Sequence, residues 1–205
     1  RDNAANLLVY SYTFRTIPDT NKPVVTLTIP AAGATGVATN AAIVVRLNHN
    51  VKIASNSIVV RVAGARAYSN GAVQNGFGLT AFVATNNGYR LTLDPPAAWG
   101  FGVSITNIVR ARDTWTNSVI SNFVFTTIAD AIAPTVIFTS PALSTVNVLT
   151  NANIIVKFDD NSGVSSNTIV VRIGTNKVLS NGVFIGATGS LVRTNATAFK
   201  AVVDR

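Results

Sequence analysis

Two adjacent carboxylates and an amide, Asp159, Asp160 and Asn161, are the side chains of this sequence best suited to bind a metal ion. Ca²⁺ takes six to eight oxygen ligands, and Asp and Asn side chains supply such oxygens. The same residue types also form Asx-type turns, in which the side-chain oxygen accepts hydrogen bonds from nearby backbone amides. We favour the turn and keep calcium as the alternative. No other cofactor is indicated.

Catalytic chemistry has few candidate groups. The chain contains no Cys and no Glu, and His49 is its only histidine. General acid–base and nucleophilic catalysis both need a second group within hydrogen-bond reach of the first. The sequence around His49 shows no such partner, so we expect a solvated side chain in a turn. An active site would depend on Asp, Lys, Ser or Tyr alone, and we do not predict an enzyme.

Two tryptophans are candidates for binding, because an exposed Trp can stack on a sugar ring or anchor a protein interface. Trp99 follows Pro95-Pro96 in an apparent loop, and we expect it to pack across the open end of the fold. Trp115 lies in a second loop, and the repeat described below places Ala4 at its counterpart, so the core does not require it. For Trp115, an interface and chance exposure are equally good interpretations.

Basic residues outnumber acidic ones, 16 Lys and Arg against 8 Asp, which gives a net charge of +8. Nucleic-acid binding would require clustered cations interleaved with aromatic residues. Here the cations are scattered singly along predicted strands, so we expect no nucleic-acid partner. Four outward positions are weak binding candidates beside Trp115, namely Arg46, Arg61, Lys157 and Arg172. They protect sheet edges and aid solubility, or they contact an acidic neighbour such as a polysaccharide.

A long internal repeat organises the whole chain. The stretch 56–62, Asn-Ser-Ile-Val-Val-Arg-Val, returns 111 residues later as Asn-Thr-Ile-Val-Val-Arg-Ile at 167–173. The same offset extends in both directions. It divides the sequence into the closing strand of one copy at 1–16, a complete module at 17–127, and a module at 128–205 that stops before its last two strands. Those strands lie beyond residue 205 or come from another chain.

The repeat also constrains the metal hypothesis. It aligns Asp159–Asn161 with Asn48–Asn50, which contain no carboxylate, so we expect no calcium ion common to all modules. Asp19 and Asp130 recur in the two short linkers. An ion between modules could use them, but a single carboxylate makes a weak site and turn capping is favoured.

Hydrophobic alternation predicts the fold class. Ile43, Val45 and Leu47 alternate with Val44, Arg46 and Asn48, which is the period-two pattern of a half-buried strand. Turn residues such as Ser69-Asn70-Gly71 separate similar runs, and no segment has helical periodicity. We therefore predict an all-β chain of tandem immunoglobulin-like antiparallel β-sandwiches. In the complete module the strands are expected near 24–29, 41–48, 57–63, 79–85, 89–94, 103–111 and 121–127.

Four motifs, taken from different copies of the repeat, resemble the bacterial Ig-like domains that occur in tandem in surface proteins. Their order and spacing within one module match those of the family. They are the module start 130–141 (Asp…Pro-Thr-Val…Ser-Pro), the segment 33–37 (Gly-Ala-Thr-Gly-Val), the turn 159–164 and the closing stretch 2–14 (Asp-Asn-Ala-Ala-Asn…Tyr-Thr-Phe). In the family the closing turn has a Gly where this chain has Ala5 and Thr116. The resemblance implies an Ig-like sandwich that serves as a spacer or adhesion element, and it implies no chemistry.

These observations predict a non-enzymatic structural or adhesive segment of an extracellular fibre, stalk, adhesin or virion surface protein. Low charge, 12% against about 25% in average proteins, agrees with a location outside the cell, at the cell surface or on a virion. We expect neighbouring modules or other copies of the chain as partners, and an acidic polysaccharide or cell surface as a further one. No membrane-spanning run is present. Two alternatives stay open: a filament subunit that exchanges strands through residues 1–16, and a carbohydrate-binding module that uses Trp115.

Overall fold

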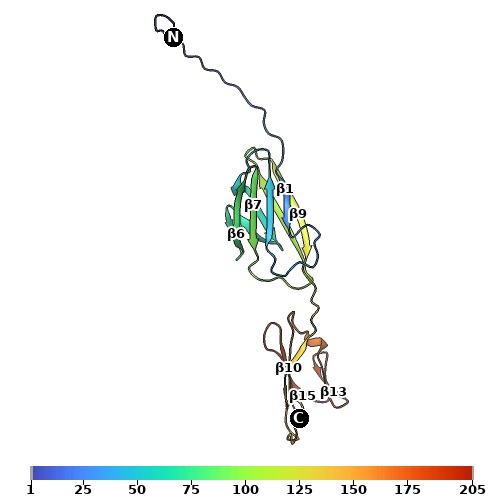
Figure 1. Cartoon of the computed structure of the whole chain (residues 1–205). Coiled ribbons are helices and arrows are strands. Elements are labelled where there is room, and N and C mark those ends of the chain that lie inside the picture. The colour runs from blue at the N-terminus through green and yellow to red at the C-terminus, as the bar shows by residue number, and fades with distance from the viewer. Residues whose placement is uncertain (1, 205) are drawn as a thin grey trace. The chain divides into compact units, whose positions relative to one another are not determined.

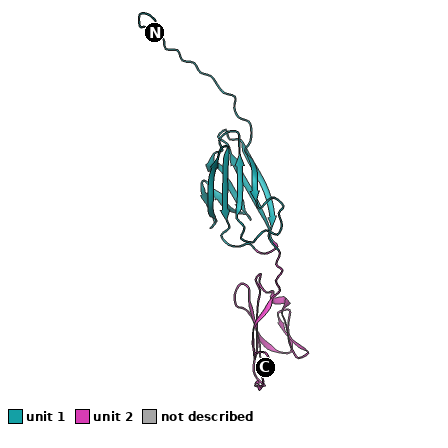
Figure 2. Ribbon diagram, in the orientation of Figure 1, with its two compact units in different colours: residues 1–99, 103–128 teal, residues 100–102, 129–205 magenta. Residues whose placement is uncertain are grey.

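A computed structural model describes residues 2–204. The chain divides into two compact units, residues 1–99 with 103–128 and residues 100–102 with 129–205 (Figure 2). Both are built from antiparallel strands, and the helical residues described are two single 3₁₀ turns, Ser55–Ser57 (η1) and Ser166–Thr168 (η2). Within this described part, no helix is long and apolar enough to cross a membrane. The predicted all-β class is confirmed.

The first unit is a sandwich of two sheets (Figure 1). One sheet has the strand order β1-β2-β7-β6, and its strands are Val24–Ile29, Ile43–Asn48, Gly88–Asp94 and Gly78–Thr85 respectively. The other has the order β5-β4-β3-β8-β9, formed by Ala72–Val73, Ala65–Ser69, Val59–Val62, Ser104–Arg112 and Ser118–Thr126. Seven of these strands lie where the alternation predicts them.

The core of this unit lies between the two sheets. Ile43, Val45 and Leu47 of β2 are fully buried, whereas Arg46 on the same strand is exposed. A slip of one residue would place Arg46 in the core and these apolar side chains in water, so the charge pattern determines the register. Burial of each aliphatic side chain contributes about 1.5–3 kcal/mol to folding.

Two short strands, β4 and β5, were not predicted. They are joined by a turn in which Asn70 and Gly71 both have positive φ, 53° and 80°. This is the backbone that a two-residue hairpin requires, and Asn-Gly is the sequence best suited to it. The turn was recognised, but the strands beside it are Ala-rich or only two residues long, and they lack a clear alternation.

The second unit has the corresponding sheets. Its four-stranded sheet has the order β10-β11-β16-β15, with strands Thr135–Ser140, Ile154–Asp159, Phe199–Asp204 and Thr188–Arg193. Its other sheet has three strands, β12, β13 and β14, at Val170–Ile173, Asn176–Ser180 and Val183–Phe184. Among its described residues, this unit has no counterpart of β8 and β9. As a result Ile173 is only half-buried, although its counterpart Val62 is fully buried.

Residues 2–16 repeat the closing turn and strand β9 without the packing of that strand. Tyr12 and Phe14 are 74% and 77% exposed. Their counterparts in β9, Phe123 and Phe125, are 4% and 1% exposed, in the core of the first unit. The two segments therefore have the same residue pattern, and only β9 has a sheet to pack against.

The closing turn has a strained backbone. Ala5 and Thr116, which occupy the position of the family's Gly, have φ values of 66° and 73°. Left-handed conformations bring Cβ close to the following carbonyl oxygen and are least favourable for β-branched residues such as Thr. Ala5 and Thr116 therefore adopt the left-handed conformation that suits Gly, at a cost in stability.

We predict that Thr116→Gly stabilises the first unit, because Gly adopts positive φ without a steric penalty. The strain energy that is relieved exceeds the free-energy cost of the more flexible unfolded chain. The free energy of unfolding should therefore rise by about 1 kcal/mol and the Tm by about 4 °C. Thermal unfolding followed by circular dichroism measures it. Thr114→Gly is the control, since Thr114 is exposed and its φ is not positive. That change should lower the Tm, and an equal effect of both substitutions would contradict the explanation.

Candidate functional site

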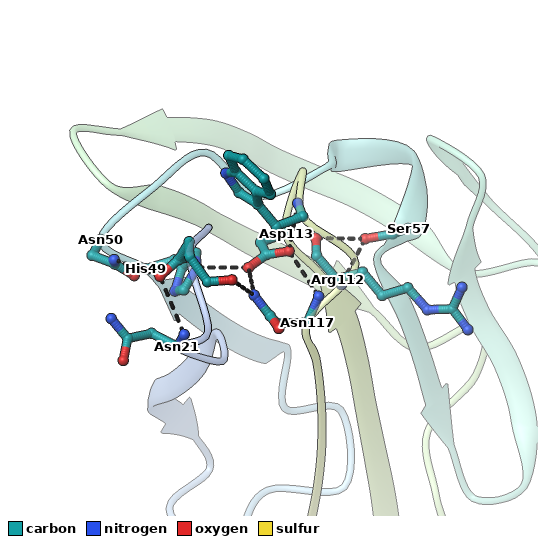
Figure 3. Close-up of polar contacts among 9 residues, drawn as sticks. Asn21, His49, Asn50, Ser57, Arg112, Asp113 and Asn117 are labelled. Carbon is teal, nitrogen blue, oxygen red and sulfur yellow. Dashed lines mark hydrogen bonds and ion pairs between the residues drawn. The ribbon is translucent and has the colours of Figure 1, made fainter. Parts of the chain in front are cut away.

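A buried carboxylate organises the turn between β8 and β9. Asp113 Oδ1 accepts hydrogen bonds from the backbone amides of Trp115 and Asn117, both at 2.8 Å. Its Oδ2 accepts from the side-chain amide of Asn117 at 2.7 Å (Figure 3). The backbone closes the same loop, because the amide of Asp113 donates to the carbonyl of Asn117 at 3.0 Å. Asp113 and Asn117 thus hold the turn closed through both side-chain and backbone hydrogen bonds.

His49 joins this turn to the linker that precedes the module. Its Nε2 lies 2.9 Å from Asp113 Oδ2 and 3.0 Å from Asp19 Oδ2. The His49 side chain is 1% exposed, and those of Asp113 and Asp19 are 0% and 9% exposed. Both neighbours are acceptors, so Nε2 carries the proton that it shares between them. The expectation of a solvated histidine without a partner was wrong.

Both carboxylates are held in the charged form. Burial of Asp113 raises the pKa of its carboxyl, but the hydrogen bonds from Asn117, Trp115 and His49 outweigh it and lower the pKa below its ordinary value. The pKa of Asp19 is lowered chiefly by the hydrogen bond from Asn50, with burial acting in the opposite direction. Two negative charges therefore face one imidazole nitrogen at neutral pH.

Further contacts fix the linker residue Asp19. Its Oδ1 accepts from Asn50 Nδ2 at 3.1 Å and from the backbone amide of Asn21 at 3.2 Å. Its main-chain carbonyl accepts from Asn117 Nδ2 at 2.9 Å. The linker is thus attached to the end of β2 and to the closing turn of the same unit.

The second unit repeats part of this arrangement. Asp130 Oδ1 accepts from Asn161 Nδ2 at 3.0 Å and from the backbone amide of Ile132 at 3.1 Å. These residues are the counterparts, at the 111-residue offset, of the three that meet at Asp19 Oδ1. Asp160 stands where His49 does. In both units the linker carboxylate is held by the same pair of donors.

The calcium candidates form a turn. Asp160 Oδ1 accepts from the Ser162 amide at 2.8 Å, the Ser162 hydroxyl at 2.7 Å and the Gly163 amide at 3.2 Å. The Asp160 amide in turn donates to Asp159 Oδ1 at 3.0 Å, and Asn161 contacts Asp130 as described. The bonds that Asp160 Oδ1 accepts from the following amides are those of an Asx turn. Asp160 Oδ2 is buried and has no hydrogen-bond partner among the described residues, and calcium at this turn stays a hypothesis.

The two tryptophans differ in environment. Trp99 is half-buried, and its ring meets that of Phe125 edge-on, with centroids 5.5 Å apart. It therefore packs on the core as expected. Trp115 is 46% exposed at the closing turn, so its side chain is available for a contact, and its binding role stays a prediction.

The basic candidates have two kinds of environment. The guanidinium groups of Arg61 and Arg172 donate to the carbonyls of Gly64 and Thr175, at 3.2 and 3.1 Å, and so brace their own hairpins. Arg46 is exposed on β2. Its counterpart Lys157 lies 4.9 Å from the centre of the Phe138 ring, within the range of a cation–π contact. No contact described for Arg46 or Arg61, the two that share a unit with Asp19, His49 and Asp113, involves those three residues.

Sequence reasoning missed Asp113, and it treated Asp19 as a single weak carboxylate. The available signal was recurrence: Asp2 and Asn6 repeat Asp113 and Asn117, as Asp130 repeats Asp19. In the structure Asp2 accepts from the Asn6 side chain at 2.9 Å, just as Asp113 does from Asn117. The separation of His49 from both carboxylates along the chain hid the cluster.

Comparison with known proteins identifies the family. A sequence profile of the bacterial Ig-like domain matches residues 19–127, slightly more than half of the chain. No curated protein gives a significant match. Among solved structures, CopC from Methylosinus trichosporium OB3b is 14% identical, with a TM-score of 0.38, over 54% of this chain and 98% of its own.

A second solved structure is a chimeric titin Z1Z2-Z1Z2 tandem functionalized with a GRGDS exogenous peptide from fibronectin. It is also 14% identical, with a TM-score of 0.34, over 89% of this chain and 84% of its own. At these scores neither structure bears on function. The profile match and the two-sheet sandwich with its closing turn agree, and the chain belongs to the family of bacterial Ig-like domains.

Proposed function

We propose that the chain is a segment of a tandem array of Ig-like modules that acts as a spacer and adhesive element in an extracellular structure, such as a fibre, stalk, adhesin or virion surface protein. The 111-residue repeat and the family membership support this proposal. The module contributes mechanical and binding properties, and no chemical step is assigned to it.

The observation that carries the proposal is the attachment of each linker to the module that follows it. Asp19 and Asp130 each accept hydrogen bonds from an Asn side chain and a linker amide of the same unit. A spacer transmits force or direction only when its linkers have restricted freedom. A spacer built of repeated modules needs the same restraint at every linker, and the hydrogen bonds to Asp19 and Asp130 repeat in both units.

Residues 2–16 fit the same proposal as the closing strand of a preceding module. Tyr12 and Phe14 correspond to core residues of β9 and are exposed where they stand. In the filament alternative, the strand at residues 2–16 packs into the sandwich of another copy of the chain. The spacer is favoured, because residues 2–16 supply a counterpart of β9 alone, and the described residues of the second unit contain no counterpart of β8 either.

Pairs of like charges support an adhesive role. Arg46 is the cross-strand neighbour of Arg90 in the first unit, and Lys157 is the neighbour of Lys200 in the second. Like charges directly opposite each other destabilise a sheet. Their presence at the same place in both units is explained by an anionic partner that would bridge them, such as an acidic polysaccharide.

We predict that Asp130→Ala releases the second linker. Loss of the carboxylate removes the hydrogen bonds from Asn161 and Ile132, so thermolysin should cleave before Ile132 at least about threefold faster. Mass spectrometry of a time course measures the rate. Asp204→Ala is the matched control, because that carboxylate contacts Asn153, remote from the linker in sequence. Equal cleavage of Asp130→Ala and the unchanged chain would contradict the attachment.

A second prediction concerns the paired cations. The double variant Arg46→Thr with Arg90→Thr should bind alginate, a polyuronate, at least about fivefold more weakly at low salt. It should be no less stable than the unchanged chain, because a repulsive pair is lost. Affinity is measured by biolayer interferometry and stability by thermal unfolding.

The control for this variant removes the same charge from the other sheet, by Arg110→Thr with Arg112→Thr, two exposed positions of β8 whose cross-strand neighbours are uncharged. It should weaken binding less than about twofold. Equal losses in the two double variants would show that only net charge matters, and the proposed binding face would be rejected.

A further inference from the structure

We propose that Asp19, His49 and Asp113 form a binding site for a divalent transition-metal ion of the Zn²⁺ class. One ligand atom from each residue lies within 4.8 Å of the others. The site belongs wholly to the first unit and connects three segments: the linker, the residue after β2 and the closing turn after β8. It does not depend on the spacer proposal.

The distances match those around an ion. Nε2 of His49 is 3.0 Å from Asp19 Oδ2 and 2.9 Å from Asp113 Oδ2. Zinc binds nitrogen and oxygen at about 2.0–2.2 Å, so neighbouring ligand atoms in its shell are about 3 Å apart. A single N–H points in one direction and cannot serve two carboxylates fully. An ion that replaces the Nε2 proton binds the nitrogen lone pair and coordinates both carboxylates.

The charge and the surroundings of the cluster also fit a cation. Two buried carboxylates face one imidazole, and buried charges require compensation. The remaining oxygens are already held: Asp113 Oδ1 by the Trp115 and Asn117 amides, and Asp19 Oδ1 by Asn50 and Asn21. Such donors orient carboxylate ligands in metal sites. The ligand atoms are therefore positioned before an ion arrives.

The ligand set selects the kind of ion. Ca²⁺ takes six to eight oxygen ligands, and this cluster offers two carboxylates and one nitrogen. Imidazole with carboxylate suits zinc and its neighbours, with water as the fourth ligand. In the second unit Asp160 replaces His49, so the nitrogen ligand is absent there. Zinc binding is thus predicted for one module of the two.

The test uses the whole chain and its single histidine. In ¹⁵N-labelled protein the imidazole gives one set of ring signals, all from His49. Addition of ZnCl₂ at pH 7 should move the Nε2 signal in slow exchange and saturate it at one equivalent, with a dissociation constant below about 1 μM by chelator competition. CaCl₂ should leave the ring signals unchanged. Ring signals that do not respond to excess ZnCl₂ would overturn the proposal.

Variants separate this site from adventitious binding. Asp19→Asn changes a linker residue and leaves the sandwich core intact, and it should weaken Zn²⁺ binding at least about a hundredfold. Asp113 is less suitable, because it also holds the closing turn. Asp160→Asn, at the counterpart of His49, should bind as the unchanged chain does. If folded Asp19→Asn, verified by thermal unfolding, binds Zn²⁺ with unchanged affinity, the assigned ligand set is wrong.

Discussion

The carboxylate of Asp113 connects the closing turn of the first unit to the end of β2 and to the preceding linker. It accepts hydrogen bonds from the Trp115 and Asn117 amides, and these hold the turn between the two longest strands. Through His49 and Asn117 the same turn contacts Asp19 of the linker. A buried charge with this many donors remains ionised, so turn, strand end and linker are fixed by one group. The strained backbone at Thr116 follows from it, since the turn must close around that charge.

Repetition shows which parts of this arrangement are local. The Asp–Asn closing turn forms at Asp2 and Asn6 without any sandwich around it, because its hydrogen bonds all lie within five residues. The hydrogen bonds to Asp130 also form in the second unit, whose residues up to 204 include no counterparts of β8 and β9. The contact of His49 with both the linker residue Asp19 and the closing-turn residue Asp113 forms only in the complete module.

The sequence was sufficient for the fold and insufficient for the site. Alternation in β2, with Arg46 outside and Ile43 inside, determines both strand and register, because the period of two is a local property. The hairpin of β4 and β5 was missed, because its strands are short and stabilised by their neighbours. His49 was misjudged for a different reason. Its partners are 30 and 64 residues away along the chain, so no local pattern in the sequence connects them.

The most direct test of the account is amide hydrogen exchange in the two linkers, measured by NMR on the unchanged chain. The amides of Asn21 and Ile132 donate to the carboxylates of Asp19 and Asp130, whereas no backbone bond is described for Thr20. The account predicts that Asn21 and Ile132 exchange at least about tenfold more slowly than an unstructured chain, and that Thr20 exchanges faster than both. Exchange of Asn21 and Ile132 at the unstructured rate would contradict the hydrogen bonds by which Asp19 and Asp130 order the linkers.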